Sequence, residues 1–105
     1  MSHAAIESGQ IVMATATNAT SAVATITGVA GKKIYVISIS GSSDKAGAKI
    51  LLKDGTTVIW QDRVSNTCAN DYFFDGYVIG SIGNNVSVTV DGTAECDANI
   101  VAAIL

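Results

Sequence analysis

The chain has 105 residues, of which 49% are hydrophobic and 14% are charged, so it has the length of one domain and a composition unlike that of disordered proteins. Six Lys and Arg residues against nine Asp and Glu residues give a net charge of −3 without a basic block, which argues against direct contact with nucleic acid. No apolar run approaches the about 18 residues of a membrane helix, and residues 1–10 lack the charged-then-apolar order of a signal peptide, so we expect neither membrane contact nor Sec export.

Short apolar stretches rich in Val, Ile and Thr recur along the chain, separated by Gly, Asn, Asp and Ser. This spacing is typical of many short β-strands, and the sequence predicts no amphipathic helix of useful length. Residues 1–9 carry no strand pattern and are predicted to form an N-terminal arm, whereas residues 10–105 are predicted to form one domain. The predicted strands cover residues 10–17, 22–27, 33–40, 48–53, 57–62, 72–79, 86–91 and 98–104. About eight strands predict an all-β fold, a single antiparallel β-sandwich resembling a jelly roll.

Side-chain alternation assigns faces to three of these strands. The run from Ile34 to Ile39 is almost continuously apolar, which predicts a strand covered on both faces. Such a strand lies either centrally in the sandwich or at a subunit contact, and we favour the subunit contact. In residues 49–53, Ile50 and Leu52 point one way and the two lysines the other, as on an exposed or edge face. The three valines of residues 86–90 share one face, which predicts a strand with one buried side.

Two Asp-Gly pairs predict tight turns. Asp54-Gly55 lies between two apolar strands, and both residues tolerate the positive φ of a type I′ hairpin turn. Asp91-Gly92 is expected to work in the same way.

The chain offers few residues for catalysis or metal binding. His3 is the only histidine and lies beside the N-terminus, so we expect neither a Ser-His-Asp nor a Cys-His arrangement. Two cysteines without close pairing do not suit a zinc site. Asp91, Glu95 and Asp97 could supply oxygen ligands to Ca²⁺, but a solvated turn explains the same residues, because the EF-hand spacing is absent. We therefore expect no enzyme activity, no catalytic residue, no metal and no cofactor.

Cys68 and Cys96 are candidates for a disulfide. Each precedes a predicted strand, and these two strands run in the same direction if every connection reverses the chain, so both cysteines lie at one end of the sandwich. Closing this loop would stabilise the fold by about 3–4 kcal/mol on the chain-entropy account. Two free thiols in a protein made in a reducing cytosol explain the same residues equally well.

Five of the six aromatic residues gather in one region. Tyr72, Phe73, Phe74 and Tyr77 lie close together in the chain, and Trp60 lies on the preceding predicted strand. Consecutive aromatic residues on a strand point to both faces, of which only one can be the core. The surplus rings predict a protein interface, although core filling under a wrapping loop or a sugar-stacking platform would also account for them.

Three stretches carry a shared pattern: AGKKIYVISIS in residues 30–40, KDGTTVI in residues 53–59 and GNNVSVTVDG in residues 83–92. With the apolar last strand they cover about residues 30–104. In this overall pattern the chain resembles the small β-sandwich virion proteins of tailed bacteriophages, of the capsid decoration (cement) or head-fibre type. The resemblance implies a jelly-roll or tumour-necrosis-factor-like sandwich that trimerises.

The resemblance also implies a mechanical function. A protein of this type is made in the host cytoplasm, binds the major capsid protein on the virion surface and stabilises the head against the pressure of packaged DNA. A symmetric trimer would bury the doubly apolar strand and the surplus aromatics, so we predict a homotrimer that makes contact through part of the region of Trp60 and residues 72–77. The alternative is a carbohydrate- or receptor-binding module of a phage tail or fibre, in which Tyr72, Tyr77 or Trp60 stacks on sugar.

Overall fold

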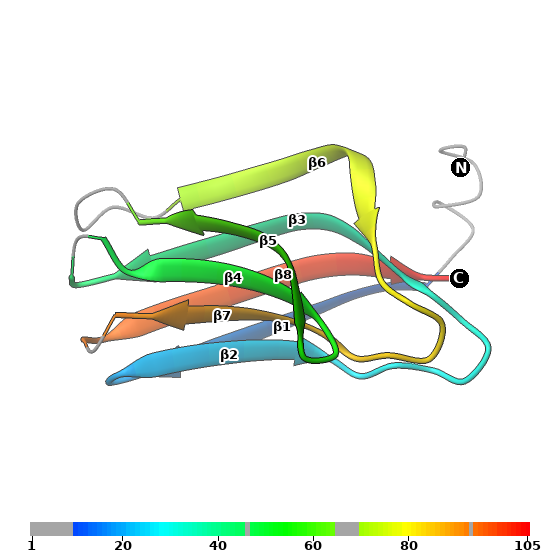
Figure 1. Ribbon diagram of the computed structural model, residues 1–105, viewed down its shortest axis with the longest axis horizontal. Coiled ribbons are helices and arrows are strands. Elements are labelled where there is room, and N and C mark those ends of the chain that lie inside the picture. Colours follow the sequence, from blue (N-terminus) through cyan, green and yellow to red (C-terminus); the bar gives the residue numbers. More distant parts are fainter. Residues whose placement is uncertain (1–9, 46, 65–69, 93) are drawn as a thin grey trace.

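The computed structural model describes residues 10–45, 47–64, 70–92 and 94–105, and these form eight β-strands (Figure 1). The strands are β1 (Gln10–Asn18), β2 (Ser21–Ile26), β3 (Ile34–Ser43), β4 (Lys49–Asp54), β5 (Thr57–Arg63), β6 (Asn70–Ile79), β7 (Val86–Asp91) and β8 (Cys96–Ile104). All eight predicted strands are present, and their ends lie within three residues of the predicted ones. The predicted arm, residues 1–9, lies outside the described residues. Among the residues described, no helix is long and apolar enough to cross a membrane.

The strands form two four-stranded antiparallel sheets packed face to face (Figure 1). The first sheet has the order β1-β8-β3-β6, and the second has the order β2-β7-β4-β5. The pairing is nested, with β1 on β8, β2 on β7, β3 on β6 and β4 on β5. This nesting is that of a hairpin folded over on itself, and it confirms the predicted jelly-roll sandwich. β6 and β8 both lie antiparallel to β3, so they run in the same direction, as predicted.

The core lies between the two sheets and consists mainly of Val, Ile, Leu and Ala. Val86, Val88 and Val90 are fully buried on one face of β7, as their alternation predicts. Ile50 and Leu52 are fully buried on β4, and the lysines of that strand lie on its outer face. β4 pairs with both β5 and β7, so its lysines mark an exposed face and not a sheet edge.

β3 is covered on both faces by side chains of the same chain. Ile34 and Val36 point into the main core. On the opposite face, Tyr35 is buried against Ala103, with Tyr77 packed beside them. Packing within the chain on both faces therefore accounts for the doubly apolar run, and the subunit contact that we favoured is not needed to explain it.

The Asp54-Gly55 hairpin forms as predicted, but its turn is of a different type. β4 ends at Asp54 and β5 begins at Thr57, so Gly55 and Thr56 are the central residues. Of these, only Gly55 has a positive φ, of 61°, which is the requirement of a type II′ turn. The predicted type I′ turn is therefore wrong, because the chain reverses one residue later than expected.

The Asp91-Gly92 pair does not form a hairpin. β7 ends at Asp91 in the second sheet, and β8 begins at Cys96 in the first, so the connection crosses between sheets. A Cβ atom on Gly92 would lie 2.7 Å from Ala48 Cβ and 2.7 Å from Ser43 Oγ. Glycine is required here by close packing and not by its backbone freedom.

Asp54 joins the hairpin to the loop that follows β6. Its carboxylate accepts hydrogen bonds from Ser81 Oγ at 2.6 Å, from Ser81 N at 3.1 Å and from Asn84 Nδ2 at 3.2 Å. The hydrogen bond from the Ser81 hydroxyl is the main cause that lowers the pKa of Asp54 from its ordinary value of 3.8. The charged carboxylate is thus stabilised in the folded protein.

Asp54→Asn is expected to lower the free energy of unfolding at pH 7 by about 1 kcal/mol, a modest loss because solvent screens this partly exposed charge. A lowered pKa contributes stability above the unfolded value, and this contribution disappears as the pH falls through the folded pKa. The difference between wild type and variant should therefore shrink as the pH falls below 3.8, in urea denaturation followed at several pH values. Asp44→Asn, which removes the charge of another exposed carboxylate, is the control. A difference that stays constant with pH would contradict the assignment.

Candidate functional site

The outer face of the first sheet exposes large apolar side chains on its two edge strands, β1 and β6. Cross-strand pairing places Ile11, Ala103, Tyr35 and Ile79 in one row, and Met13, Val101, Ser38 and Phe73 in another. We call these two rows the apolar rows. Phe73 is 82% exposed, Met13 72%, Ile11 54% and Ile79 47%. The apolar rows contain no charged side chain, and four of their eight residues are large hydrophobic groups open to solvent.

Phe73 is exposed because its neighbours in β6 point the other way. Trp60 on β5 packs edge-on against Tyr72 and Phe74, with ring centroids 4.6 Å and 5.6 Å apart. These three rings are partly buried and pack against the main core. They close the side of the sandwich where β5 and β6 are the edge strands of their sheets (Figure 1).

A hydrogen-bonded chain orients the ring of Tyr72. Its hydroxyl donates to Asp62 Oδ2 at 2.7 Å and accepts from Asn70 Nδ2 at 3.0 Å. The bond from Tyr72 lowers the pKa of Asp62 from its ordinary value, and burial of the ring, followed by its bond to Asp62, raises the pKa of Tyr72. Tyr72 is therefore committed to contacts within the chain.

Tyr77 packs on the opposite surface of the sheet from Trp60. It is the one described non-glycine residue with a positive φ, of 57°, a conformation that costs a bulky residue about 1–3 kcal/mol. It lies within a break in register, where Val36 pairs with Val78 but Ser38 pairs with Phe73. This excursion of β6 brings Tyr77 over Tyr35 and Ala103. Of the five predicted aromatic residues, four thus make contacts within the chain and Phe73 is left open.

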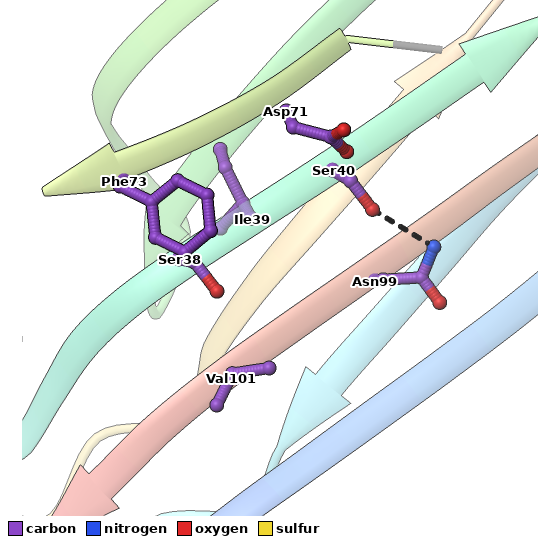
Figure 2. Close-up of a pocket in the computed structure, with 7 residues that line it drawn as sticks. All are labelled: Ser38, Ile39, Ser40, Asp71, Phe73, Asn99 and Val101. Atoms are coloured by element: carbon purple, nitrogen blue, oxygen red, sulfur yellow. Dashed lines mark hydrogen bonds between the residues drawn. The ribbon is translucent and has the colours of Figure 1, made fainter.

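Next to Phe73 the sheet carries a shallow groove of about 290 Å³ (Figure 2). Its lining residues are Ser38, Ile39, Ser40, Asp71, Phe73, Asn99 and Val101. Asn99 Nδ2 donates to Ser40 Oγ at 3.0 Å, which fixes the amide across two neighbouring strands. As Figure 2 shows, the Phe73 ring and Val101 lie at one end of the groove, and the polar side chains of Asn99, Ser40 and Asp71 lie at the other. The groove therefore lies between the apolar rows and the polar side chains of Asn99, Ser40 and Asp71.

Of the acidic residues near the start of β8, Asp97 forms hydrogen bonds within the fold. Asp97 accepts hydrogen bonds from Thr17 Oγ1 at 2.6 Å and from Ser42 Oγ at 3.3 Å. In the described part of the chain, no three His, Cys, Asp or Glu side chains are grouped closely enough to hold a metal ion. His3 lies outside the described residues.

Cys96 is a buried thiol at the start of β8. Its Sγ lies 3.1 Å from Ala94 O, 3.4 Å from Ser43 Oγ and 3.7 Å from Thr20 O. Cys68 lies outside the described residues, so the proposed disulfide between the two cysteines stays a prediction.

The sequence contained one unused signal for this face. In β1, Ile11 and Met13 alternate with Val12, Ala14 and Ala16, which pack against the core. Large apolar residues on both sides of one strand indicate a second covered face. The strands that continue this face across the sheet are β8, β3 and β6, which lie far apart in the sequence. The apolar rows can therefore be recognised only from the register in which these strands pair.

No family model matches the sequence, and no curated protein matches it. Among solved structures, the chain is similar to the CBM36-1 domain of a multidomain xylanase from the hindgut metagenome of Trinervitermes trinervoides. The TM-score is 0.53, the identity is 15%, and the match covers 90% of this chain and 95% of that domain.

It is also similar to a GH26-CBM35 β-(1,4)-mannanase of Podospora anserina, with a TM-score of 0.50, 13% identity, and coverage of 95% of this chain and 26% of that one. The coat protein of Tobacco streak virus aligns more weakly, with a TM-score of 0.42, 12% identity, and coverage of 89% and 85%. That score is too low to support an argument. At these identities the likeness concerns the fold alone, and the chain is a jelly-roll β-sandwich, an architecture that accommodates both binding modules and structural proteins.

Proposed function

We propose that the protein is a non-enzymatic structural protein of a bacteriophage virion, a capsid decoration protein that binds the major capsid protein as a homotrimer. The observation that carries the proposal is the set of exposed apolar rows on the first sheet, with Phe73 82% and Met13 72% exposed. Exposed apolar faces of this kind mark contacts between proteins. The resemblance of the sequence to phage virion proteins supplies the setting, the surface of the head.

Self-association would bury the apolar rows at little electrostatic cost. Each copy carries a net charge of −3, but the apolar rows contain no charged residue, so a different patch of a neighbouring copy can lie on them without meeting a like charge there. A contact between two different patches of identical chains can close into a ring of three. In this proposal Phe73 is the central aromatic of the contact. Trp60, Tyr72 and Phe74, which the sequence included in the same interface, act as its support.

The oligomeric state tests the first half of the proposal. We expect the purified protein to have the mass of a trimer by size-exclusion chromatography with light scattering, with and without reductant. Phe73→Ser combined with Met13→Ser should yield a folded monomer, because it replaces the two most exposed apolar side chains of the face. Val23→Ser, at a valine that is 50% exposed on β2 in the second sheet, is the matched control and should remain a trimer. A wild-type monomer at high concentration would contradict the trimer.

Binding to capsids tests the second half. Shells assembled from the major capsid protein of the same genome, without this protein, should bind it in a saturable manner and become more resistant to heat. Shells that neither bind it nor gain resistance would overturn the decoration role.

The groove beside Phe73 favours one other function, that of a carbohydrate-binding module. An exposed aromatic ring next to an oriented amide and a hydroxyl suits a sugar, whose apolar face stacks while its hydroxyls bond. The same face would then bind glycans as an isolated monomer. Saturable binding to a glycan array, lost with Phe73→Ser and Asn99→Ala, together with no binding to shells, would select this function.

A further inference from the structure

Three loops at one end of the sandwich are joined into a single rigid unit. They are residues 27–33, the hairpin turn 55–56 and residues 80–85, and we call them the loop platform (Figure 1). Gly83 N donates to Lys32 O at 2.8 Å, which joins the first loop to the third. Asn85 joins the third loop to both others, because its Oδ1 accepts from Gly28 N at 2.7 Å and its backbone oxygen accepts from Gly55 N at 2.8 Å.

Close backbone packing adds to these bonds. A Cβ atom on Gly28 would lie 2.2 Å from the backbone oxygen of Gly83, so the two loops touch at a point where only glycine fits. The Asp54 carboxylate holds the third loop from below through Ser81 and Asn84. Loops bonded in this way do not have to be ordered when a partner binds, which removes one of the main costs of association.

The loop platform presents apolar and basic side chains to solvent. Val29 is 40% exposed and Ile82 is 60% exposed, one on each of the two long loops. Lys32 and Lys33, two of the six basic residues of the chain, are exposed on the first loop, and no Asp or Glu occurs within the three segments. With the Asp54 carboxylate that binds the third loop, this end of the sandwich carries two lysines against one carboxylate, and two aliphatic side chains are exposed on it.

We propose that the loop platform is the surface that seats the protein on its lattice, and that it fits an apolar socket rimmed by carboxylates on a capsid protein. This rests on the proposed function: if the apolar rows are used between copies of the chain, the lattice contact needs a different surface. Val29 and Ile82 fill the socket, and Lys32 and Lys33 face its acidic rim. A membrane fits less well, because membrane-binding surfaces combine Trp, Phe or Leu with many basic residues.

The test measures co-sedimentation of the protein with shells of the major capsid protein from the same genome. Val29→Ser combined with Ile82→Ser should weaken binding at least tenfold, since each buried aliphatic side chain is worth about that factor. Lys32→Glu combined with Lys33→Glu should weaken it at least tenfold through repulsion by the acidic rim. Val23→Ser is the control and should bind as wild type does. Light scattering confirms that each variant keeps the oligomeric state of the wild type, and circular dichroism that each is folded.

The outcomes separate this inference from the proposed function. Binding by wild type and equally by both platform variants would overturn the platform contact while leaving the decoration role intact. No binding by wild type would overturn both. Binding to vesicles of phosphatidylcholine and phosphatidylserine that is lost in the platform variants, without binding to shells, would replace the protein socket by a membrane.

Discussion

Gly28→Ala is expected to lower the free energy of unfolding by about 3 kcal/mol, although it adds only one methyl group. The added Cβ would lie 2.2 Å from Gly83 O and 2.7 Å from Asn84 O, and both are backbone atoms that cannot rotate away. The loops must separate to admit it. Their separation would break the hydrogen bond between Gly28 N and Asn85 Oδ1 and strain the one between Gly83 N and Lys32 O.

Gly31→Ala is the matched control in the same loop. Gly31 has a positive φ of 76° with no atom within 4 Å of an added Cβ, so the substitution adds backbone strain without a collision and should cost about 1 kcal/mol. Urea denaturation of both variants measures the difference. Equal losses would show that the two loops are not in contact at Gly28.

Leu52→Ala is expected to lower the free energy of unfolding by about 2–5 kcal/mol, because it leaves a cavity between the two sheets. Leu52 is fully buried on β4 and lies opposite Val88, which is also fully buried, so few neighbours can move in to fill the space. A small domain has about 5–15 kcal/mol of stability in total, so this loss would be visible as a large shift of the denaturation midpoint.

Leu51→Ala removes the same atoms one residue earlier and should cost less than about 1 kcal/mol. Leu51 is only partly buried on the outer face of the second sheet, where water replaces the lost side chain without a cavity. Similar losses at residues 51 and 52 would contradict the assignment of the two faces of β4.

The positions of the strands followed from short-range patterns. The alternation of valines in β7 and the apolar run in β3 depend only on the geometry of an extended chain, in which successive side chains point to opposite faces. The turn after Asp54 was anticipated from the Asp-Gly pair, although its type was not, because the register of β4 on β5 decides which residues lie at its centre. The prediction of a hairpin turn at Asp91-Gly92 was wrong because its two flanking strands belong to different sheets.

The candidate site could be predicted only in part. The consecutive aromatic residues indicated that some ring would lie outside the core, and alternation set Phe73 on the face opposite to Tyr72 and Phe74, but it did not show which face is the core. Packing of Trp60 between Tyr72 and Phe74 left Phe73 as the open ring, and the excursion of β6 took Tyr77 to Tyr35. Nothing in the local sequence carried this information, since each contact joins residues on different strands.

The sequence by itself determined that this chain is an all-β sandwich with one buried face on most strands, because alternation and turn residues act over a few positions. Tertiary structure decided which exposed groups share one face. The apolar rows unite Ile11, Met13, Phe73 and Ile79 from the two edge strands of the first sheet, and the loop platform unites Val29 with Ile82. These groups share a face only when distant strands pair in register, and the alternation within β1 indicates a second covered face without showing which strands continue it.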